Sequence, residues 1–578
     1  MYEWQLDDLY PSFESEAFQN DLASVDTLLE AFQHIQFDDN LENIKAVIAL
    51  KEKQYVLFRK LSSYISLNLA TKTTDTQSTN YQNVMANKFN QFAKINAQID
   101  RFLGEIDTDI TQDEDLAEYT FYFAELKEEA KHLLSDEAEE VITKLNRSAG
   151  SGWSNLTEYL TSTVETDFRG ETKTLSQLRN LAYSADSDVR KEAFEVEIKL
   201  YDGIKDSIAF SLNNIKSQVL DVTQMRGYDS PLDETLKKSR MSRETLDALL
   251  SAIKNNLPIF RKYLNHKASL LGHDNGLPFY DLFAPMGKTS QTFTVEESKA
   301  YLVEKFQAFA PDLAEMTTQF YDKHYMDFYP RKGKRGGAFC SNLPFIKQSR
   351  IMLNFGESLS DILTIAHELG HAYHGTKIHS HRPLNWRYSM PVAETASTFN
   401  EAIVMNYLIK EAKSDDEKVA VIEQYLQDVT QIIVDIYSRY LFESEVFEKR
   451  QNSFMFADEL ADMMTKAQIE AYGDGLDKDA LHPYMWVNKT HYYSTGLSFY
   501  NFPYAYGGLF SRGLYEIYQN QPDGFVEKYG ELLHKTTVAS VEDVAKVMDI
   551  DVTSEAFWQS TMNGIADYVD QFIALTTK

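Results

Sequence analysis

The sequence predicts a mainly α-helical protein that contains one small β-sheet. Apolar residues recur every three or four positions over long stretches, as in residues 44–70 and 120–147, and this period is typical of amphipathic helices. Only residues 325–356 show strand patterns bounded by glycine and proline. No repeat of fixed period and no segment of low complexity interrupts the helical pattern. We therefore expect helices nearly everywhere and a short β element in one place.

Length and motif positions suggest how the chain is organised. A chain of 578 residues is long enough for several domains. Every motif that indicates chemistry lies in the second half, whereas the first 200 residues carry helical periodicity and no sharp motif. We therefore expect a helical N-terminal lobe over residues 1–200 and a catalytic domain over residues 201–578.

The charge of the chain excludes some classes of partner. The formal net charge is −30, from 57 basic and 87 acidic residues, and such a surface repels nucleic-acid phosphates and anionic lipids. No apolar run approaches the ~18 residues that a membrane span needs. The acidic first 15 residues lack the apolar core of a signal peptide, and Cys340 is the single cysteine. We expect a cytoplasmic protein without nucleic-acid or membrane partners.

The expected β element consists of a strand, a loop and a second strand. Residues 325–330, YMDFYP, indicate a strand that ends at proline, and residues 331–337, RKGKRGG, indicate a basic loop. Residues 349–355, SRIMLNF, alternate in a way typical of a second strand. Both strands come shortly before the motif described next, so the small sheet should lie beside it.

A helix is expected over residues 361–374, in the stretch that contains TIAHELGHAYHG. Ser358 and Asp361 have the spacing of a capping box, and Gly375 stands where a glycine often ends a helix. Apolar residues between these ends recur at helical spacing and can face a core.

On that helix, His367 and His371 project from the same side, one turn apart. Two imidazoles at this spacing can share a tetrahedral Zn²⁺, and Glu368 stands beside them, free to hold a water molecule. A chance HExxH arises in roughly a few per cent of such chains, so a surface helix with ordinary histidines is the alternative.

The third ligand separates the classes of zinc peptidase. In the compact class a histidine lies six residues after the second one, but here that position is Lys377, and His374 occupies the glycine position of that class. The compact class is therefore excluded. The other common solution is a carboxylate from a following helix.

Such a helix is expected to begin at Pro391. Glu394 and Glu401 lie seven residues apart on one face of it, together with Ser397. We expect Glu394 to be the third ligand and Glu401 to hold one of the ligand histidines from behind. An exposed helical glutamate is the alternative for Glu401.

These motifs together resemble the M3 family of zinc metallopeptidases, which contains thimet oligopeptidase and oligoendopeptidase F. The resemblance rests on HELGH followed by VAETASTFNEA, on DFYPRKGKRGGAF at 327–339, and on HYYSTGLSFYNFPYAYGG at 491–508. It is clear over residues 320–510. It implies a large helical shell around a deep substrate channel that admits short peptides, and one zinc ion per chain.

The resemblance also implies a role for residues 491–508. In that family the corresponding tyrosine-rich segment supplies groups that stabilise the oxyanion of the tetrahedral intermediate. The candidates here are His491, Tyr493, Tyr500 and Tyr504. Because the chain has 34 tyrosines, packing is the alternative for each of them.

The segment before the metal helix is expected to bind the substrate. The strand at 349–355 would offer unpaired backbone groups to an extended peptide. Gly336, Gly337 and Ala338 carry little or no side chain and would let the peptide backbone approach closely. The alternative for this basic stretch is a solvated loop.

We therefore expect a zinc-dependent oligoendopeptidase that hydrolyses internal bonds of short peptides by metal-activated water, with Glu368 as general base. One alternative is a zinc carboxypeptidase, since helical enzymes of that type also combine HExxH with a downstream glutamate. A second is a peptide-binding protein without catalysis, which the presence of His367, His371 and Glu394 together with Glu368 disfavours. The oligomeric state cannot be read from the sequence.

Overall fold

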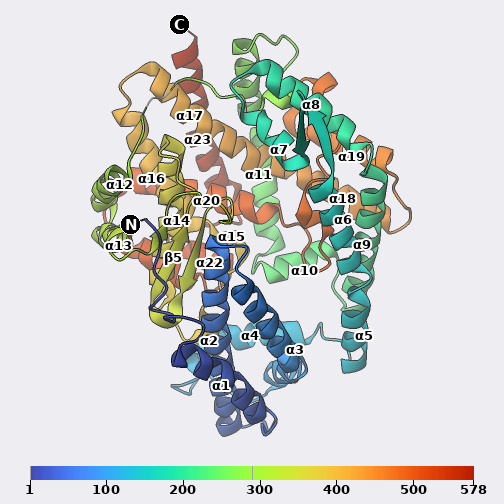
Figure 1. Ribbon diagram of the computed structural model, residues 1–578, viewed down its shortest axis with the longest axis vertical. Helices are drawn as coiled ribbons and strands as arrows, with labels where there is room; N and C mark the ends of the chain where they lie inside the picture. The colour runs from blue at the N-terminus through green and yellow to red at the C-terminus, as the bar shows by residue number, and fades with distance from the viewer. Residues whose placement is uncertain (1, 289–290, 578) are drawn as a thin grey trace. The chain divides into compact units, whose positions relative to one another are not determined.

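Helices make up most of the protein in the computed structural model, which describes residues 2–288 and 291–577 (Figure 1). The expected mainly α-helical fold with a small β-sheet before the HExxH helix is confirmed, but a second small sheet, over residues 165–174, was not predicted. Contacts divide the chain into two units of three segments each. The first comprises Met1–Leu133, Ser290–Tyr407 and Ile517–Asp549, and the second comprises Leu134–Thr289, Leu408–Glu516 and Ile550–Lys578. The division into a lobe over 1–200 and a catalytic domain over 201–578 follows sequence order instead, and it stays a prediction.

The first three helices of the first unit begin at side-chain caps. Ser15, Asn40 and Asp75 each accept a hydrogen bond from the backbone N–H three residues later, which satisfies a donor that the first turn leaves unpaired. The helices are α1 (Glu16–Phe32), α2 (Leu41–Thr71), α3 (Thr76–Glu105), α4 (Thr120–Ala130), α12 (Val295–Phe309), α13 (Pro311–Asp322), α14 (Leu359–Ile378), α15 (Met390–Ala393), α16 (Thr395–Glu411), α21 (Phe525–Lys535) and α22 (Val541–Lys546).

A three-stranded sheet lies within the first unit. It consists of β3 (Met326–Asp327), β4 (Phe339–Leu343) and β5 (Gln348–Met352), in the order β3-β5-β4. β5 pairs parallel to β3 and antiparallel to β4. The expectation that the strand at 349–355 offers unpaired backbone to a peptide is wrong, because β5 is hydrogen-bonded on both sides. The strands at the two edges are β3 and β4, and β4 was not predicted from the sequence.

The core of the first unit joins the sheet to the N-terminal helices. Ile44 of α2 and Phe92 of α3 belong to the same buried apolar cluster as Leu343 of β4 and Met352 of β5. Burying each such side chain stabilises the fold by ~1.5–3 kcal/mol. Both β4 and β5 also contact α14, so the sheet lies between α14 and the N-terminal helices (Figure 1).

The second unit is helical apart from one hairpin, β1 (Glu165–Phe168) with β2 (Glu171–Thr174). A π-helix, η6 (Gln431–Asp435), joins α17 to α18 without a break. The helices are α5 (Asp136–Asn146), α6 (Gly150–Thr163), α7 (Leu175–Asn180), α8 (Ser187–Tyr201), α9 (Lys205–Met225), α10 (Pro231–Lys238), α11 (Arg243–Leu270), α17 (Asp415–Thr430), α18 (Ile436–Arg450), α19 (Ala457–Tyr472), α20 (Phe502–Asn520) and α23 (Glu555–Thr576).

In the described part of the chain, none of the helices combines the length and the apolar character that crossing a bilayer requires.

Candidate metal and catalytic site

The helix that carries the HExxH motif is α14, and it begins as expected. The Ser358 hydroxyl accepts a hydrogen bond from the Asp361 N–H, and the Asp361 carboxylate accepts one from the Ser358 N–H, which forms the predicted capping box. The expected end at Gly375 is wrong, because the helix continues to Ile378. Gly375 instead makes room for Asn342 of β4: a Cβ at this position would lie 2.3 Å from the Asn342 Oδ1.

Three side chains converge beside α14. The Nε2 atoms of His367 and His371 lie 3.2 Å apart, and each lies 3.3 Å from Oε2 of Glu394. These residues form a group that could hold a metal ion. Glu394 was expected within a continuous helix, but it stands in the turn between α15 and α16. The turn nonetheless directs its carboxylate at both histidines.

The geometry fits a zinc ion. A tetrahedral Zn²⁺ with bonds of about 2.0–2.1 Å holds its ligand atoms about 3.3–3.4 Å apart, and the three observed separations are close to this value. Two imidazoles and one carboxylate leave the fourth position open, as in catalytic zinc sites. The three side chains are half-buried, with exposed fractions of 27% for His367, 18% for His371 and 28% for Glu394, so the site is partly open to solvent.

Further side chains orient the three candidate ligands. Oε1 of Glu401 lies 2.8 Å from Nδ1 of His367, so the proton of this imidazole belongs on Nδ1 and the lone pair on Nε2. The Ser397 hydroxyl donates to Glu394 Oε2 at 2.6 Å. Asn342 donates to the backbone oxygen of His371 at 3.2 Å. Sequence reasoning anticipated the contact of Glu401 but not the role of Asn342, which belongs to the unpredicted strand β4.

Close packing of α14 against α16 sets the distance between the histidines and Glu394. A Cβ at Gly370 would lie 2.3 Å from the backbone oxygen of Ala396 and 2.5 Å from the Ser397 Cα. Asn400 of α16 also donates to the backbone oxygen of Ala366 at 3.3 Å. The glycine inside the HELGH motif therefore has a structural reason: the two backbones touch there.

The carboxylates make the site favourable for a cation. Burial lowers the pKa of His367, but the hydrogen bond and charge of Glu401 outweigh burial and raise it to about 9. Burial raises the pKa of Glu394, but the hydrogen bond to His371 and the charges of both histidines lower it to about 2. The site therefore stabilises positive charge at His367 and negative charge on Glu394.

Glu368 is the residue expected to act as the base, and this role stays a prediction. Its side chain is buried, and its Oε2 has no hydrogen-bond partner among residues 2–288 and 291–577. Burial raises the pKa of Glu368, although the charges of His367 and His371 oppose this effect. A buried carboxylate oxygen without a partner is costly unless a water molecule or a ligand bonds to it.

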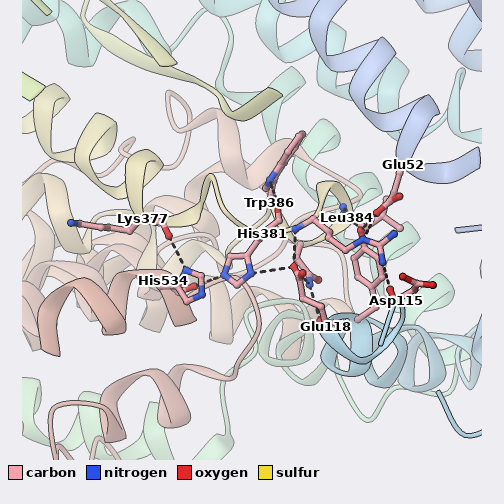
Figure 2. A network of polar contacts seen from close by, with 11 residues as sticks. Glu52, Asp115, Glu118, Lys377, His381, Leu384, Trp386 and His534 are labelled. Carbon is pink, nitrogen blue, oxygen red and sulfur yellow. Dashed lines mark hydrogen bonds and ion pairs between the residues drawn. The ribbon is translucent and has the colours of Figure 1, made fainter. Parts of the chain in front are cut away.

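Residues 379–389 connect α14 to α15 and are held by a polar network (Figure 2). His381 contacts Glu118 through Nδ1, at 3.4 Å, and the backbone oxygen of His534 through Nε2, at 2.9 Å. Trp386 donates to the backbone oxygen of His381, and Arg382 donates to Glu52 of α2 at 2.8 Å. The turn that returns the chain from the histidines to Glu394 is thus fixed at several points. These contacts occupy both ring nitrogens of His381.

The tyrosine-rich candidates belong to the second unit. Tyr504 donates to the Tyr500 hydroxyl at 3.0 Å, and Nε2 of the half-buried His491 has no partner among the described residues. Tyr493 is buried and donates to the backbone oxygen of Trp486 at 2.9 Å, which is an arrangement typical of packing. The catalytic roles of His491, Tyr493, Tyr500 and Tyr504 stay predictions.

Gly336, Gly337 and Ala338 lead directly into the edge strand β4. Gly337 has a φ of +77°, and a Cβ at either glycine would meet no atom within 4 Å. The backbone is therefore open to an approaching chain here, although contact with substrate stays a prediction.

Comparisons with known proteins show which family the chain resembles. The profile described as peptidase family M3 matches residues 180–564, and the profile described as oligopeptidase F matches residues 104–165. The chain is 24% identical to oligopeptidase PepF of Bacillus subtilis, over all of this chain and 87% of that protein. It is 25% identical to group B oligopeptidase PepB of Streptococcus agalactiae, over 92% of this chain and 88% of that protein.

Solved structures share the fold. Oligoendopeptidase-F from Enterococcus faecium aligns with a TM-score of 0.72 at 19% identity, over 97% of this chain and 99% of that one. PZ peptidase A, solved with an inhibitor, aligns with a TM-score of 0.74 at 18% identity, with the same coverage.

Proposed function

The chain belongs to peptidase family M3, and from that premise we propose that it is a zinc-dependent oligoendopeptidase that hydrolyses internal bonds of short peptides. The observation that carries the zinc assignment is the convergence of His367 Nε2, His371 Nε2 and Glu394 Oε2 at the mutual distances of a tetrahedral zinc site. The names of the relatives, oligopeptidase PepF and oligopeptidase PepB, support short peptides as substrates.

In this proposal each residue of the site has a separate task. A bound zinc ion would lower the pKa of a water molecule towards ~7 and polarise the scissile carbonyl. Glu368 accepts the proton of the attacking water and delivers it to the leaving amine, for which its unpartnered Oε2 is suited. Glu401 holds the imidazole of His367 with its Nε2 free of a proton, and Ser397 fixes the carboxylate of Glu394.

Substrate binding and oxyanion stabilisation involve the other candidates. The edge strand β4, entered through Gly336, Gly337 and Ala338, can add a peptide as a further strand. Tyr500 and Tyr504 can donate hydrogen bonds to the oxyanion, as can His491, and we retain Tyr493 as the fourth candidate of that segment.

We further propose that residues 201–578 make up the catalytic domain and residues 1–200 a helical lobe, with a substrate channel that admits only short peptides. Cytoplasmic location is supported by the single cysteine, Cys340, which has no disulfide partner. The acidic surface disfavours nucleic acid and membranes as partners.

Digestion of a peptide mixture graded in length, followed by mass spectrometry, tests this function. We expect internal cuts, an upper limit on substrate length, and loss of cleavage with a chelator. Peptides blocked at the C-terminus separate this proposal from a zinc carboxypeptidase, since a carboxypeptidase cannot cut them. If no peptide is cleaved by the zinc-loaded protein, the non-catalytic alternative holds.

A further inference from the structure

Three basic side chains come together inside the second unit from distant parts of the sequence. Arg439 lies on α18, whereas Lys489 and His491 lie at the start of η9 (Thr490–Tyr493). Burial and then the charge of Arg439 lower the pKa of both Lys489 and His491, and the charge of Lys489 lowers the pKa of His491 further. These groups are therefore close enough to repel one another within a buried region.

Lys489 is the basic group of this region that forms no ion pair with a described residue. Its side chain is half-buried. No carboxylate among the described residues lies within ion-pairing distance of its ammonium group. The cations around it are already paired inside the unit: Arg439 with Asp435, Lys216 with Glu443 at 2.7 Å, and Arg179 with Glu197 at 3.3 Å.

A buried hydroxyl group beside these cations also lacks a partner. Tyr492 is fully buried, and its hydroxyl has no hydrogen bond to any residue that the structure describes. After burial, Arg439 is the group with the largest effect on the pKa of Tyr492, so the hydroxyl lies near the guanidinium. The Nε of Arg439 is likewise buried without a hydrogen bond to a described residue. Buried donors of this kind are costly unless a ligand accepts their hydrogen bonds.

The local backbone is unusual at the same place. The π-helix η6 ends at Asp435, and Arg439 follows one turn later on the continuous helix. A π-helical turn inserts an extra residue and redirects the side chains that follow it, and such turns occur frequently at functional sites. Asp435 and Arg439 form an ion pair one turn apart on this continuous helix.

We propose that Arg439 and Lys489, with the hydroxyl of Tyr492, bind a carboxylate group of the peptide substrate. This inference rests on the proposed function for the claim that the ligand is a peptide. A guanidinium and an ammonium group bind a carboxylate through charge-assisted hydrogen bonds, and the tyrosine hydroxyl can donate a third. The carboxylate is either the C-terminus of the peptide or an acidic side chain, and both sources present the same chemistry. We call these three residues the carboxylate site.

The site lies beside a candidate of the catalytic machinery. His491 lies near Arg439 and Lys489, and its ring contacts the ring of Tyr492 in a tilted arrangement with centroids 4.6 Å apart. A carboxylate bound at the carboxylate site would therefore hold the peptide close to His491, and the enzyme would select peptides by the position of their negative charge.

Isothermal titration calorimetry of the full-length, chelated protein tests the inference without turnover. The probes are N-acetyl-Ala-Ala-Phe, its C-terminal amide, and N-acetyl-Ala-Asp-Phe amide. We expect at least one carboxylate probe to bind about tenfold or more tightly than the uncharged amide, and Lys489→Met to reduce this ratio to about twofold or less. Lys478→Met, which removes an exposed lysine of the same unit, should leave the ratio unchanged.

The two carboxylate probes identify the source. Preference for the free C-terminus, for the aspartate, or for both supports a carboxylate site. Equal binding of all three probes to the unmodified protein overturns the proposal. A preference for a carboxylate probe that persists in Lys489→Met also overturns it, provided that a thermal melt shows the variant to be folded.

The pH dependence of binding provides a second readout that needs no variant. The charged groups that face Lys489 are Arg439, Asp435, Arg179, Glu197 and His491. Burial and the charge of Arg439 lower the pKa of Lys489 to about 7, whereas His491, with a pKa lowered to about 3, stays neutral above pH 5. Loss of the ammonium charge should therefore weaken binding of the carboxylate probe about tenfold between about pH 6 and pH 8, and binding of the amide should not change. A flat profile for the carboxylate contradicts the role of Lys489.

Failure of the carboxylate site and failure of the oligoendopeptidase assignment would give different results. Absence of peptide cleavage by the zinc-loaded protein would contradict the oligoendopeptidase assignment but would leave the calorimetry as it stands. Cleavage of peptides without any preference for a carboxylate would contradict the carboxylate site alone.

Discussion

Replacing Gly370 by alanine should separate the two helices that carry the candidate ligands. The added Cβ would lie 2.3 Å from the Ala396 oxygen, 2.5 Å from the Ser397 Cα and 2.7 Å from the Ala396 carbonyl carbon. All three atoms belong to the backbone of α16 or of the turn before it, so no side chain can move aside to relieve the contact. α14 and α16 must shift apart.

The size of the shift follows from the same distances. Real Cβ contacts are essentially never shorter than 3.0 Å, so the Ala396 oxygen must move by about 0.7 Å, the difference between 3.0 and 2.3 Å. Overpacking of this kind costs ~1–3 kcal/mol, while the better helix propensity of alanine returns at most ~1 kcal/mol. Zinc sites tolerate deviations of only about 0.2 Å in ligand distances, so we expect zinc affinity to fall roughly tenfold or more.

Zinc titration with a competing chelator and a thermal melt of the chelated protein measure the two effects. Gly530→Ala is the matched control, because Gly530 is also a helical glycine of the first unit, and the nearest atom to its added Cβ is the Lys377 Cε at 3.9 Å. The control should be neutral or stabilising by ~0.5–1 kcal/mol. Unchanged zinc affinity and stability in Gly370→Ala would refute the reasoning that backbone contact at Gly370 sets the ligand geometry.

Three further substitutions address the site. Glu368→Gln should retain zinc but lose turnover by ~10²–10⁴, because the amide cannot accept the proton of the attacking water; near-normal kcat in steady-state assays would exclude Glu368 as the base. His371→Ala should lose stoichiometric zinc in elemental analysis, and retention of one zinc per chain would remove His371 from the ligand set. Glu401→Ala should lower zinc affinity by ~10–100-fold. Glu401→Gln should lower it less, because its amide oxygen can still accept a hydrogen bond from His367 Nδ1. Equal losses of zinc affinity in chelator competition would indicate that the charge of Glu401 acts rather than its hydrogen bond.

The parts of the site that depend on local spacing could be predicted from the sequence. Helical periodicity places His367 and His371 on one side of α14, and it places Glu401 on the following helix, where its carboxylate contacts His367. These predictions depend on one or two turns of helix, where the geometry is determined by the backbone itself.

The parts that depend on tertiary contacts could not be predicted in the same way. Gly375 has the sequence context of a helix end, but its actual role is to accommodate Asn342, which comes from a strand without clear alternation. Likewise, nothing in the spacing of Arg439 and Lys489 indicates that they meet, because α18 and η9 are brought together by the fold of the second unit.

Anomalous diffraction at the zinc absorption edge, on crystals of the protein purified with zinc, tests the central claim most directly. We predict one peak per chain, about 2.0–2.2 Å from His367 Nε2, His371 Nε2 and a carboxylate oxygen of Glu394. A peak at other residues, or a fully loaded crystal without a peak at these three, would contradict it.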